Sequence, residues 1–266
     1  MFDRFNRSID YLRISVTDRC NLRCTYCVPS GDFRWIPHDQ ILSFEEMAEV
    51  TREAVSLGVY KVRITGGEPL VRKGITGFVR MLAEIPGIDD LSMTTNGILL
   101  AGFARELKQA GLMRVNISLD TLDPFKFAEI TGGGELQSVL KGIEAVLNEG
   151  FAPVKINCVV HNSGHEPDAL DVAAFALEMG LQIRFIPQMD LSSGYFGIVE
   201  GGEGGNCRMC NRIRLTANGF VKPCLFSDLQ YSVRDMGIRQ ALLMAVQNKP
   251  QCGSHNHTNS FHNIGG

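Results

Sequence analysis

Short apolar runs alternate with longer amphipathic segments between residues 11 and 187. Six runs of four to seven residues are predicted to be strands, namely Leu12–Val16, Val62–Thr65, Leu91–Thr95, Val115–Leu119, Val154–Val160 and Ile183–Ile186. The segments 74–85, 100–110, 136–148 and 167–179 have helical periodicity, and the clearest helix begins at Ser43, where Glu46 completes a capping box. Repeated strand–helix units with right-handed crossovers predict a parallel sheet.

One face of each predicted strand is polar, and the opposite face holds Leu, Val, Ile and Met. The polar sets are Arg13/Ser15/Thr17, Lys61/Arg63/Thr65, Ser92/Thr94/Asn96, Asn116/Ser118/Asp120, Lys155/Asn157 and Gln182/Arg184. A flat sheet covered on both sides would be apolar on both faces. The pattern therefore predicts an α/β fold, a partial (β/α)6 barrel whose polar faces surround a ligand-binding lumen.

The texture of the sequence changes after residue 190. Residues 191–206 are rich in Gly and Ser and are predicted to be a linker or mobile loop. Residues 207–266 carry three cysteines, a predicted helix near Arg239–Val246 and a polar tail that ends in Gly265-Gly266. We expect three regions: a barrel over 1–190, a connector over 191–206 and a C-terminal segment.

Charge and hydropathy narrow the class of protein. The formal net charge is −3, which gives no general attraction to nucleic acid or to anionic membranes. No run of eighteen apolar residues is present, and Asp3 and Arg4 interrupt the N-terminus where a signal peptide would be apolar. We expect a cytoplasmic protein that binds neither nucleic acid nor membrane.

Six of the eight cysteines fall into two groups, which indicates metal binding rather than disulfides. Cys20, Cys24 and Cys27 follow the first strand and can hold three irons of a cubane cluster, leaving the fourth iron open. A zinc site would need a further ligand, and His38 lies outside the usual spacing. Cys158 is interpreted as a small core hydrophobe and Cys252 as a surface thiol without a role.

The second group is Cys207, Cys210 and Cys224. Its spacing fits a second cluster with an open iron. The same spacing also fits a zinc ribbon completed by Cys252 or by one of the tail histidines His255, His257 and His262.

Five cations project from the polar strand faces, and on those faces only Asp120 opposes them. They are Arg13, Lys61, Arg63, Lys155 and Arg184. Placing so many like charges in one lumen is unfavourable unless an anion fills it, so the pattern predicts a polyphosphate ligand.

The segment from Cys20 to Cys27 resembles the signature of the radical S-adenosylmethionine (SAM) superfamily. The resemblance implies that SAM chelates the open iron and is cleaved to a 5′-deoxyadenosyl radical. Gly66-Gly67-Glu68-Pro69 resembles the superfamily's glycine-rich motif, which bonds the methionine amino group. The implied SAM-binding set also includes Tyr26, Thr94, Asn96, Ser118 and Met189, although Thr94, Asn96 and Ser118 could equally be a satisfied polar wall.

Three further segments are similar to radical enzymes that cyclise GTP in the first step of molybdenum-cofactor biosynthesis. They are Cys207–Leu215, Lys222–Leu225 and the terminal Gly265-Gly266. The resemblance implies that GTP binds between two [4Fe–4S] clusters, that Arg212 and Arg214 complete a triphosphate site with the five strand cations, and that Gly265 and Gly266 assist radical initiation. The implied product is (8S)-3′,8-cyclo-7,8-dihydroguanosine 5′-triphosphate. The implied partners are an electron donor such as a flavodoxin, a downstream cyclic pyranopterin monophosphate synthase and a second copy of the chain in a homodimer.

The chain departs from that family in the connector, where such enzymes usually have dozens more residues that help to cover the barrel. We therefore expect the lateral closure of the barrel to be altered. A peptide-modifying radical enzyme with a twitch-like segment is the alternative, because Gly219-x4-Cys224 fits that pattern too. A non-catalytic cluster-binding or zinc-binding protein is a third hypothesis, which metal analysis would distinguish.

Overall fold

A single curved sheet of nine strands organises the molecule. The computed structural model describes residues 1–27, 35–258 and 261–264. The strands are β1 (Tyr11–Ser15), β2 (Lys61–Thr65), β3 (Asp90–Thr95), β4 (Arg114–Ser118), β5 (Val154–Val160), β6 (Gln182–Pro187), β7 (Arg212–Leu215), β8 (Phe220–Lys222) and β9 (Tyr231–Ser232), and their order is β6-β5-β4-β3-β2-β1-β7-β8-β9. Strands β1 to β6 are parallel throughout, which confirms the predicted half-open (β/α)6 barrel.

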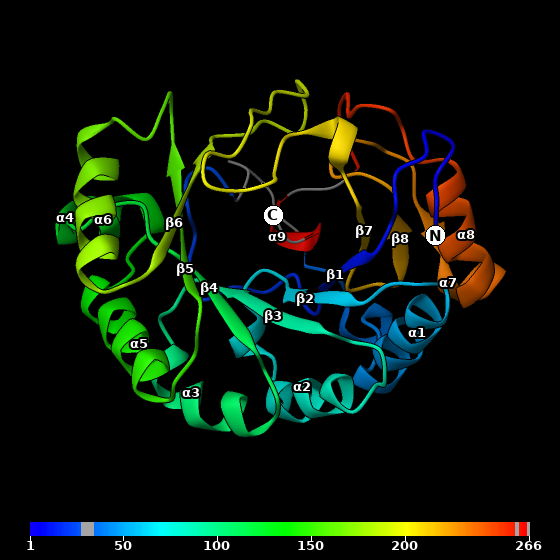
Figure 1. Cartoon of the computed structure of the whole chain (residues 1–266), viewed down its shortest axis with the longest axis horizontal. Helices are drawn as coiled ribbons and strands as arrows, with labels where there is room; N and C mark the ends of the chain where they lie inside the picture. The colour runs from blue at the N-terminus through cyan, green and yellow to red at the C-terminus, as the bar shows by residue number, and fades with distance from the viewer. Residues whose placement is uncertain (28–34, 259–260, 265–266) are drawn as a thin grey trace.

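Helices cover the convex side of the curved sheet (Figure 1). They are α1 (Phe44–Ser56), α2 (Ile75–Ala83), α3 (Leu100–Gln109), α4 (Pro124–Thr131), α5 (Leu136–Asn148), α6 (Pro167–Glu178), α7 (Val233–Met236) and α8 (Ile238–Gln247). Helix α9 (Phe261–Ile264) lies instead within the curve of the sheet (Figure 1). Helix α1 begins at the predicted capping box, in which Ser43 Oγ accepts from the Glu46 amide and Glu46 accepts from the Ser43 amide.

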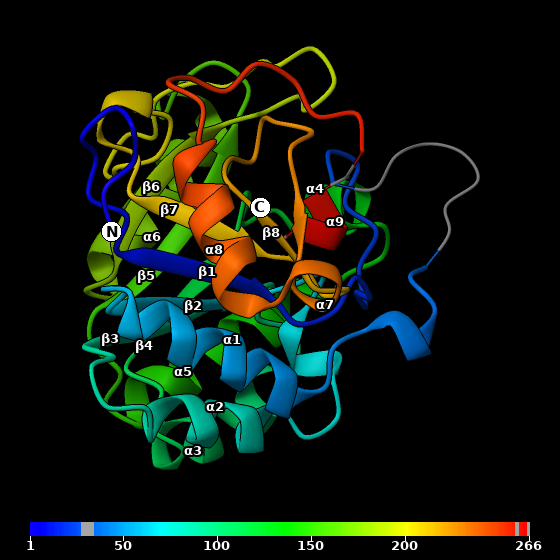
Figure 2. The ribbon, with the colours of Figure 1, turned by 90° about the vertical axis from the view of Figure 1, so that its right-hand side faces the viewer.

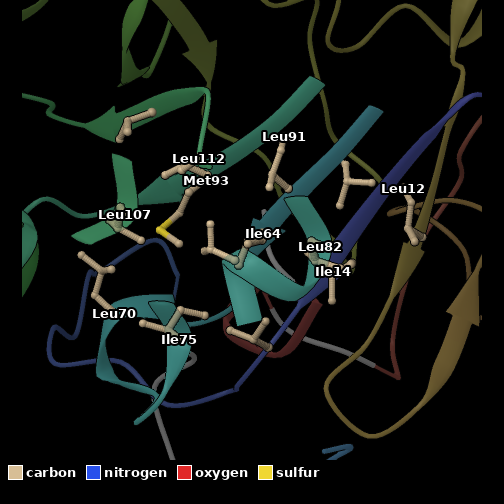
Figure 3. Packing of buried hydrophobic residues seen from close by; sticks show 14 of the residues in the cluster. Leu12, Ile14, Ile64, Leu70, Ile75, Leu82, Leu91, Met93, Leu107 and Leu112 are labelled. Carbon is tan, nitrogen blue, oxygen red and sulfur yellow. The ribbon is translucent and has the colours of Figure 1, made fainter. Parts of the chain in front are cut away.

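The hydrophobic core lies between the sheet and these helices. Leu12, Ile14 and Ile64 point outward from β1 and β2 and are completely buried against the helical layer (Figure 3). The rings of Phe44 and Phe78 stack with their centroids 4.7 Å apart and join α1 to α2. Because the outward face of each strand carries this burial, the inward face is free to be polar.

The C-terminal segment continues the barrel sheet, which the sequence pattern did not predict. Strand β7 lies parallel to β1, and β8 and β9 extend the sheet in antiparallel order. Helix α8 packs over β8 and β9 beside α1 (Figure 2). Strands almost two hundred residues apart therefore share one row of side chains.

Residues 191–206, which the sequence predicts to be a linker or mobile loop, lie against the barrel. Glu200 exchanges two backbone hydrogen bonds with Phe185 of β6, and the Val199 amide donates to the Gly204 carbonyl at 2.9 Å. At Gly201 an added Cβ would lie 2.5 Å from the Ile183 carbonyl oxygen. Glycines therefore allow this connector to lie directly on the edge strand of the barrel.

The C-terminal tail packs against apolar residues, although its sequence is polar. Helix α9 contacts β1, and Ile264 is 1% exposed. Ile264 packs in a small cluster with Leu191 at the start of the connector and Phe226 after β8. Ile264 is thus buried at the end of the segment that the sequence predicts to be a polar tail, whereas His255 and His257 are exposed.

Candidate active site

A cavity of about 510 Å³ lies inside the curve of the sheet. All seven predicted cations line it, although they come from five different strands: Arg13, Lys61, Arg63, Lys155, Arg184, Arg212 and Arg214. Cys207, Cys210, Cys224, Met189 and Thr94 line the same cavity. The structure thus joins the cation set and the second cysteine group at one place.

The strand register explains this convergence. Arg214 of β7, Arg13 of β1 and Arg63 of β2 are consecutive partners across three neighbouring strands. Burial and the neighbouring guanidinium groups of Arg13 and Arg184 lower the pKa of Arg63 to about 9. Burial also lowers the pKa of Arg214 to about 9, with Arg13 and Arg212 acting in the same direction. The row is an electrostatically unfavourable arrangement that an anion would relieve.

The cavity wall also contains buried polar atoms that a ligand could satisfy. Within the described part of the chain, Arg184 Nε and Asn157 Oδ1 are buried without a hydrogen-bond partner. Both residues line the cavity. A ligand that supplies an acceptor for Arg184 and a donor for Asn157 would satisfy them.

Three cavity residues escaped the sequence analysis. Tyr11 precedes Arg13 by one step on the same face, and Arg13 and Arg63 each lie 5.5 Å from its ring centroid. Asp90 and Arg114 begin their strands one residue earlier than predicted and pair with each other inside the cavity. Extending the alternation by one residue at each strand start would have found all three.

Asp120 does not oppose the cations as expected. Its carboxylate accepts a 2.6 Å hydrogen bond from the Tyr26 hydroxyl and one from the Val159 amide. The acids that do face the cavity are Asp90 and Glu203. Asp120 instead ties the first cysteine segment to the ends of β4 and β5.

The first cysteine group lies in the loop directly after β1. Burial raises the pKa of Cys24 and Cys27 to about 12, so both thiols are neutral unless a metal ion displaces the proton. The Leu22 amide donates to Cys20 Sγ at 3.4 Å, and Asn96 Nδ2 lies 3.7 Å from the same sulfur. Three thiols in one short loop, with amide donors at Cys20, fit an iron–sulfur cluster.

The glycine motif packs against the backbone that leads into this loop. The Gly67 amide donates to the Thr17 carbonyl at 2.7 Å, and the Glu68 amide donates to the Arg19 carbonyl at 2.8 Å. An added Cβ on Gly67 would lie only 2.3 Å from the Arg19 carbonyl oxygen. Glycine is therefore required for β2 to hold the cysteine loop in place.

Glu68 links this motif to β3. Its carboxylate accepts from the amides of Leu70 and Asn96 and from the Thr95 hydroxyl, at 2.7–3.0 Å. The side chain of Asn96 then donates to Asn21 Oδ1 at 2.8 Å. The predicted SAM-binding segments thus form one hydrogen-bonded network, with Pro69 buried beside Glu68.

Of the other residues predicted to contact SAM, Thr94 and Met189 line the cavity, and Ser118 pairs in register with Asn157 at the end of β4. Gly265 and Gly266 lie outside the described residues. The predicted SAM site and the cavity therefore adjoin along the ends of β3 to β5.

Cys207 begins a short 3-10 helix, η3 (Cys207–Met209), and Cys210 follows it directly. Cys224 lies just after the end of β8. Burial opposes ionisation of Cys210, but Lys249 and Arg212 lower its pKa to about 7. In the described residues no three His, Cys, Asp or Glu side chains converge closely enough to hold a single metal ion.

Comparison with known proteins identifies the class to which this fold and site belong. Residues 14–176 match the family model of the radical SAM superfamily. SuiB of Streptococcus suis, in its structure with S-adenosylmethionine, has the same fold with a TM-score of 0.71 and 17% identity, over 93% of this chain and 66% of that chain. The structure of native anSMEcpe with bound AdoMet gives a TM-score of 0.62 at 16% identity, over 91% of this chain and 81% of that chain.

Curated relatives narrow the class further. A GTP 3′,8-cyclase of Thermodesulfovibrio yellowstonii is 39% identical over 312 residues, covering 97% of each chain. Another, of Pelotomaculum thermopropionicum, is 40% identical over 305 residues, covering 94% of each. These alignments are longer than the 266 residues of this chain, so the relatives carry segments that it lacks. The chain belongs to the radical SAM superfamily and, within it, to the GTP 3′,8-cyclase family.

The superfamily's cofactors are S-adenosylmethionine and a [4Fe–4S] cluster, for which the first cysteine loop provides a fitting donor set. None of the helices in the described ranges is both long and apolar enough to cross a membrane.

Proposed function

We propose that this chain cyclises GTP to the 3′,8-cyclo nucleotide that begins molybdenum-cofactor biosynthesis. The observation that carries the proposal is the cavity in which seven cations face the second cysteine group. The relatives named GTP 3′,8-cyclase, which align with almost the whole chain, support the same assignment.

The seven cations bind the triphosphate. Arg214, Arg13 and Arg63 form a row across β7, β1 and β2, and Lys61, Lys155, Arg184 and Arg212 surround it. Each guanidinium can donate two parallel hydrogen bonds to a phosphate, which fixes orientation as well as charge. Holding the nucleotide in this way sets the ribose and the base at a reactive geometry.

The first cluster is held by Cys20, Cys24 and Cys27, and SAM is held by Gly66, Gly67, Glu68, Pro69, Tyr26, Thr94, Asn96, Ser118 and Met189. When bound, these cofactors supply a carbon radical able to abstract hydrogen from the ribose. Glu68 and Asn96 keep the cysteine loop aligned with the strand ends, and the cation row brings the sugar to that edge. The protein's contribution is therefore positioning.

A second [4Fe–4S] cluster at Cys207, Cys210 and Cys224 would face the purine. These cysteines line the same cavity as the cations, so a nucleotide whose phosphates meet the cations can bring its base to them. Gly265 and Gly266 are proposed to assist radical initiation; Ile264, the described residue before them, is buried near the second cysteine group.

The proposed reaction also implies partners and a cellular location. We infer an electron donor such as a flavodoxin, consumption of the product by a cyclic pyranopterin monophosphate synthase, a cytoplasmic location and a homodimer as the assembly to test. The reaction requires the electron donor because SAM cleavage consumes an electron.

The deciding experiment is anaerobic reconstitution followed by a 5′-deoxyadenosine assay with and without GTP. We expect GTP to stimulate deoxyadenosine formation strongly, and deletion of Gly265-Gly266 to abolish the stimulation. Arg52→Met, an exposed cation on α1, serves as a control that should leave the stimulation intact. Deoxyadenosine formation indifferent to GTP would overturn the substrate and redirect the search toward peptides.

A further inference from the structure

A fourth thiol, Cys252, lies beside the second cysteine group, although the sequence linked it to that group only in the zinc-ribbon alternative. Cys252 Sγ lies 3.1 Å from Cys207 Sγ, although the two residues are 45 positions apart. Cys207, Cys210 and Cys224 line the cavity, whereas Cys252 is exposed beside Cys207. The contact therefore places two thiols at one corner of the site.

A buried arginine fixes this contact through the backbone. Arg7 Nη1 donates to the carbonyls of Cys207 at 2.7 Å and Gln251 at 3.0 Å, and Nη2 donates to the Pro250 carbonyl at 2.7 Å. Asp3 balances its charge at 2.6 Å. One guanidinium thus holds both cysteine-bearing segments together.

The segment around Cys252 also contacts the parts of the chain that follow Cys210 and precede Cys224. Lys249, which is 1% exposed, donates to the carbonyls of Arg212 at 2.7 Å and Pro223 at 2.6 Å. An added Cβ on Gly253 would lie 3.3 Å from Cys224 Sγ. Residues 249–253 are therefore built into the second cysteine site.

We propose that Cys207 and Cys252 are interchangeable ligands of the same iron of the second cluster. Sulfurs that bind different irons of a cubane lie well apart, so two sulfurs in contact serve one corner. In the exchange, the Cys252 thiol gives its proton to the departing Cys207 thiolate and forms the new iron–sulfur bond. No electron is transferred, and the number of bound irons is unchanged.

The inference rests on the proposed second cluster, and counting iron in the full chain separates the two. In a Cys20→Ala/Cys24→Ala/Cys27→Ala parent, only the second site can load, with about four irons per chain. We expect Cys207→Ala and Cys252→Ala, each alone, to keep the parent's iron, sulfide and reduced-cluster EPR intensity, and the pair together to lose most of them. Cys210→Ala and Cys224→Ala are matched controls that should lose them singly.

Loss of iron from Cys207→Ala to the level of Cys210→Ala would overturn the exchange and leave the second cluster standing. A parent that binds no iron would overturn the second cluster and, with it, the exchange. Circular dichroism of each variant shows whether iron was lost through unfolding.

Alkylation of the reconstituted, unsubstituted chain gives an independent measurement that needs no variant. Interchangeable ligands leave one of the two thiols free in each molecule. Iodoacetamide followed by peptide mapping should therefore find Cys207 alkylated in some molecules and Cys252 in the others. Alkylation of Cys252 in every molecule, with Cys207 always protected, would overturn the proposal.

Discussion

Arg63, Arg214 and Glu68 are buried ionisable side chains that the protein stabilises in different ways. Glu68 accepts three hydrogen bonds from its own loop and from β3, so its site is complete within the chain. The two arginines flank Arg13 in register, and an anion that enters the cavity would relieve the repulsion among these like charges. The same class of residue thus has a structural role in one place and a binding role in the other.

Replacing one cation of the row should separate binding from stability. In the absence of nucleotide, Arg63→Met removes a buried like charge, and we expect the free energy of unfolding to rise by about 1–4 kcal/mol. GTP affinity should fall by about tenfold or more, because a charge-assisted contact is lost. Urea denaturation and equilibrium binding measure the two effects, with Arg52→Met as the control. A variant that is destabilised without nucleotide would contradict the view of an anion-dependent row.

Glu68 should make stability depend on pH. Burial raises its pKa from the ordinary 4.5 to about 7, so the folded chain holds this proton more tightly than the unfolded chain. That stabilisation is complete below pH 4.5 and is lost as pH rises through 7, at a cost of about 3 kcal/mol. Urea denaturation at several pH values should show this loss of stability in the unsubstituted chain and not in Glu68→Gln. The same pH dependence of the free energy of unfolding in both proteins would refute the prediction.

Among the elements, those with a local pattern could be predicted and those defined by pairing could not. Val154–Val160 and Leu136–Asn148 were predicted to the residue, because alternation and helical periodicity depend only on neighbours in the chain. Helix α4 was missed although Asp123 and Pro124 provide a cap and a first-turn proline. Strands β7 to β9 are short and have meaning only beside β1, so no local signal predicts them.

The packing of the β2 loop on the β1 loop can be tested with two glycines. In Gly67→Ala the new methyl meets the Arg19 carbonyl, so we expect a loss of about 1–3 kcal/mol in the free energy of unfolding and loss of iron at the first cysteine group. Gly77 lies in α2 with no atom within 4 Å of an added Cβ, so Gly77→Ala should stabilise by up to about 1 kcal/mol. Thermal denaturation and iron analysis compare them; equal effects would show that the loop contact is unimportant.

At the scale of the molecule, the site is made where the two ends of the chain meet the barrel. Six of the nine described strands and five of the seven cations were predictable, because those five cations lie on polar faces of the predicted strands. Arg212 and Arg214 lie on β7 and were predicted only through the family resemblance. The side-by-side placement of Arg13 and Arg214, and the contact of Cys207 with Cys252, were not, because long-range pairing determines them. The connector likewise forms a cavity wall through contacts with β6 that its Gly-rich composition does not reveal.

Helix α9 should stabilise the packing of the connector against the loop after β8. Ile264 packs with Leu191 of the connector and Phe226 beyond β8, and the nearby Asn256 amide donates to the Leu191 carbonyl at 2.7 Å. Ile264→Ala leaves a cavity in this cluster, which lowers the free energy of local opening, so exchange of the Asn256 amide should accelerate by about tenfold or more. Hydrogen exchange read by mass spectrometry measures this, with the exposed Leu229→Ala as a control. Because Gly265 follows Ile264 directly, GTP-stimulated deoxyadenosine formation should fall with the same variant. Unchanged exchange would mean that the connector and the loop after β8 close this face without the tail.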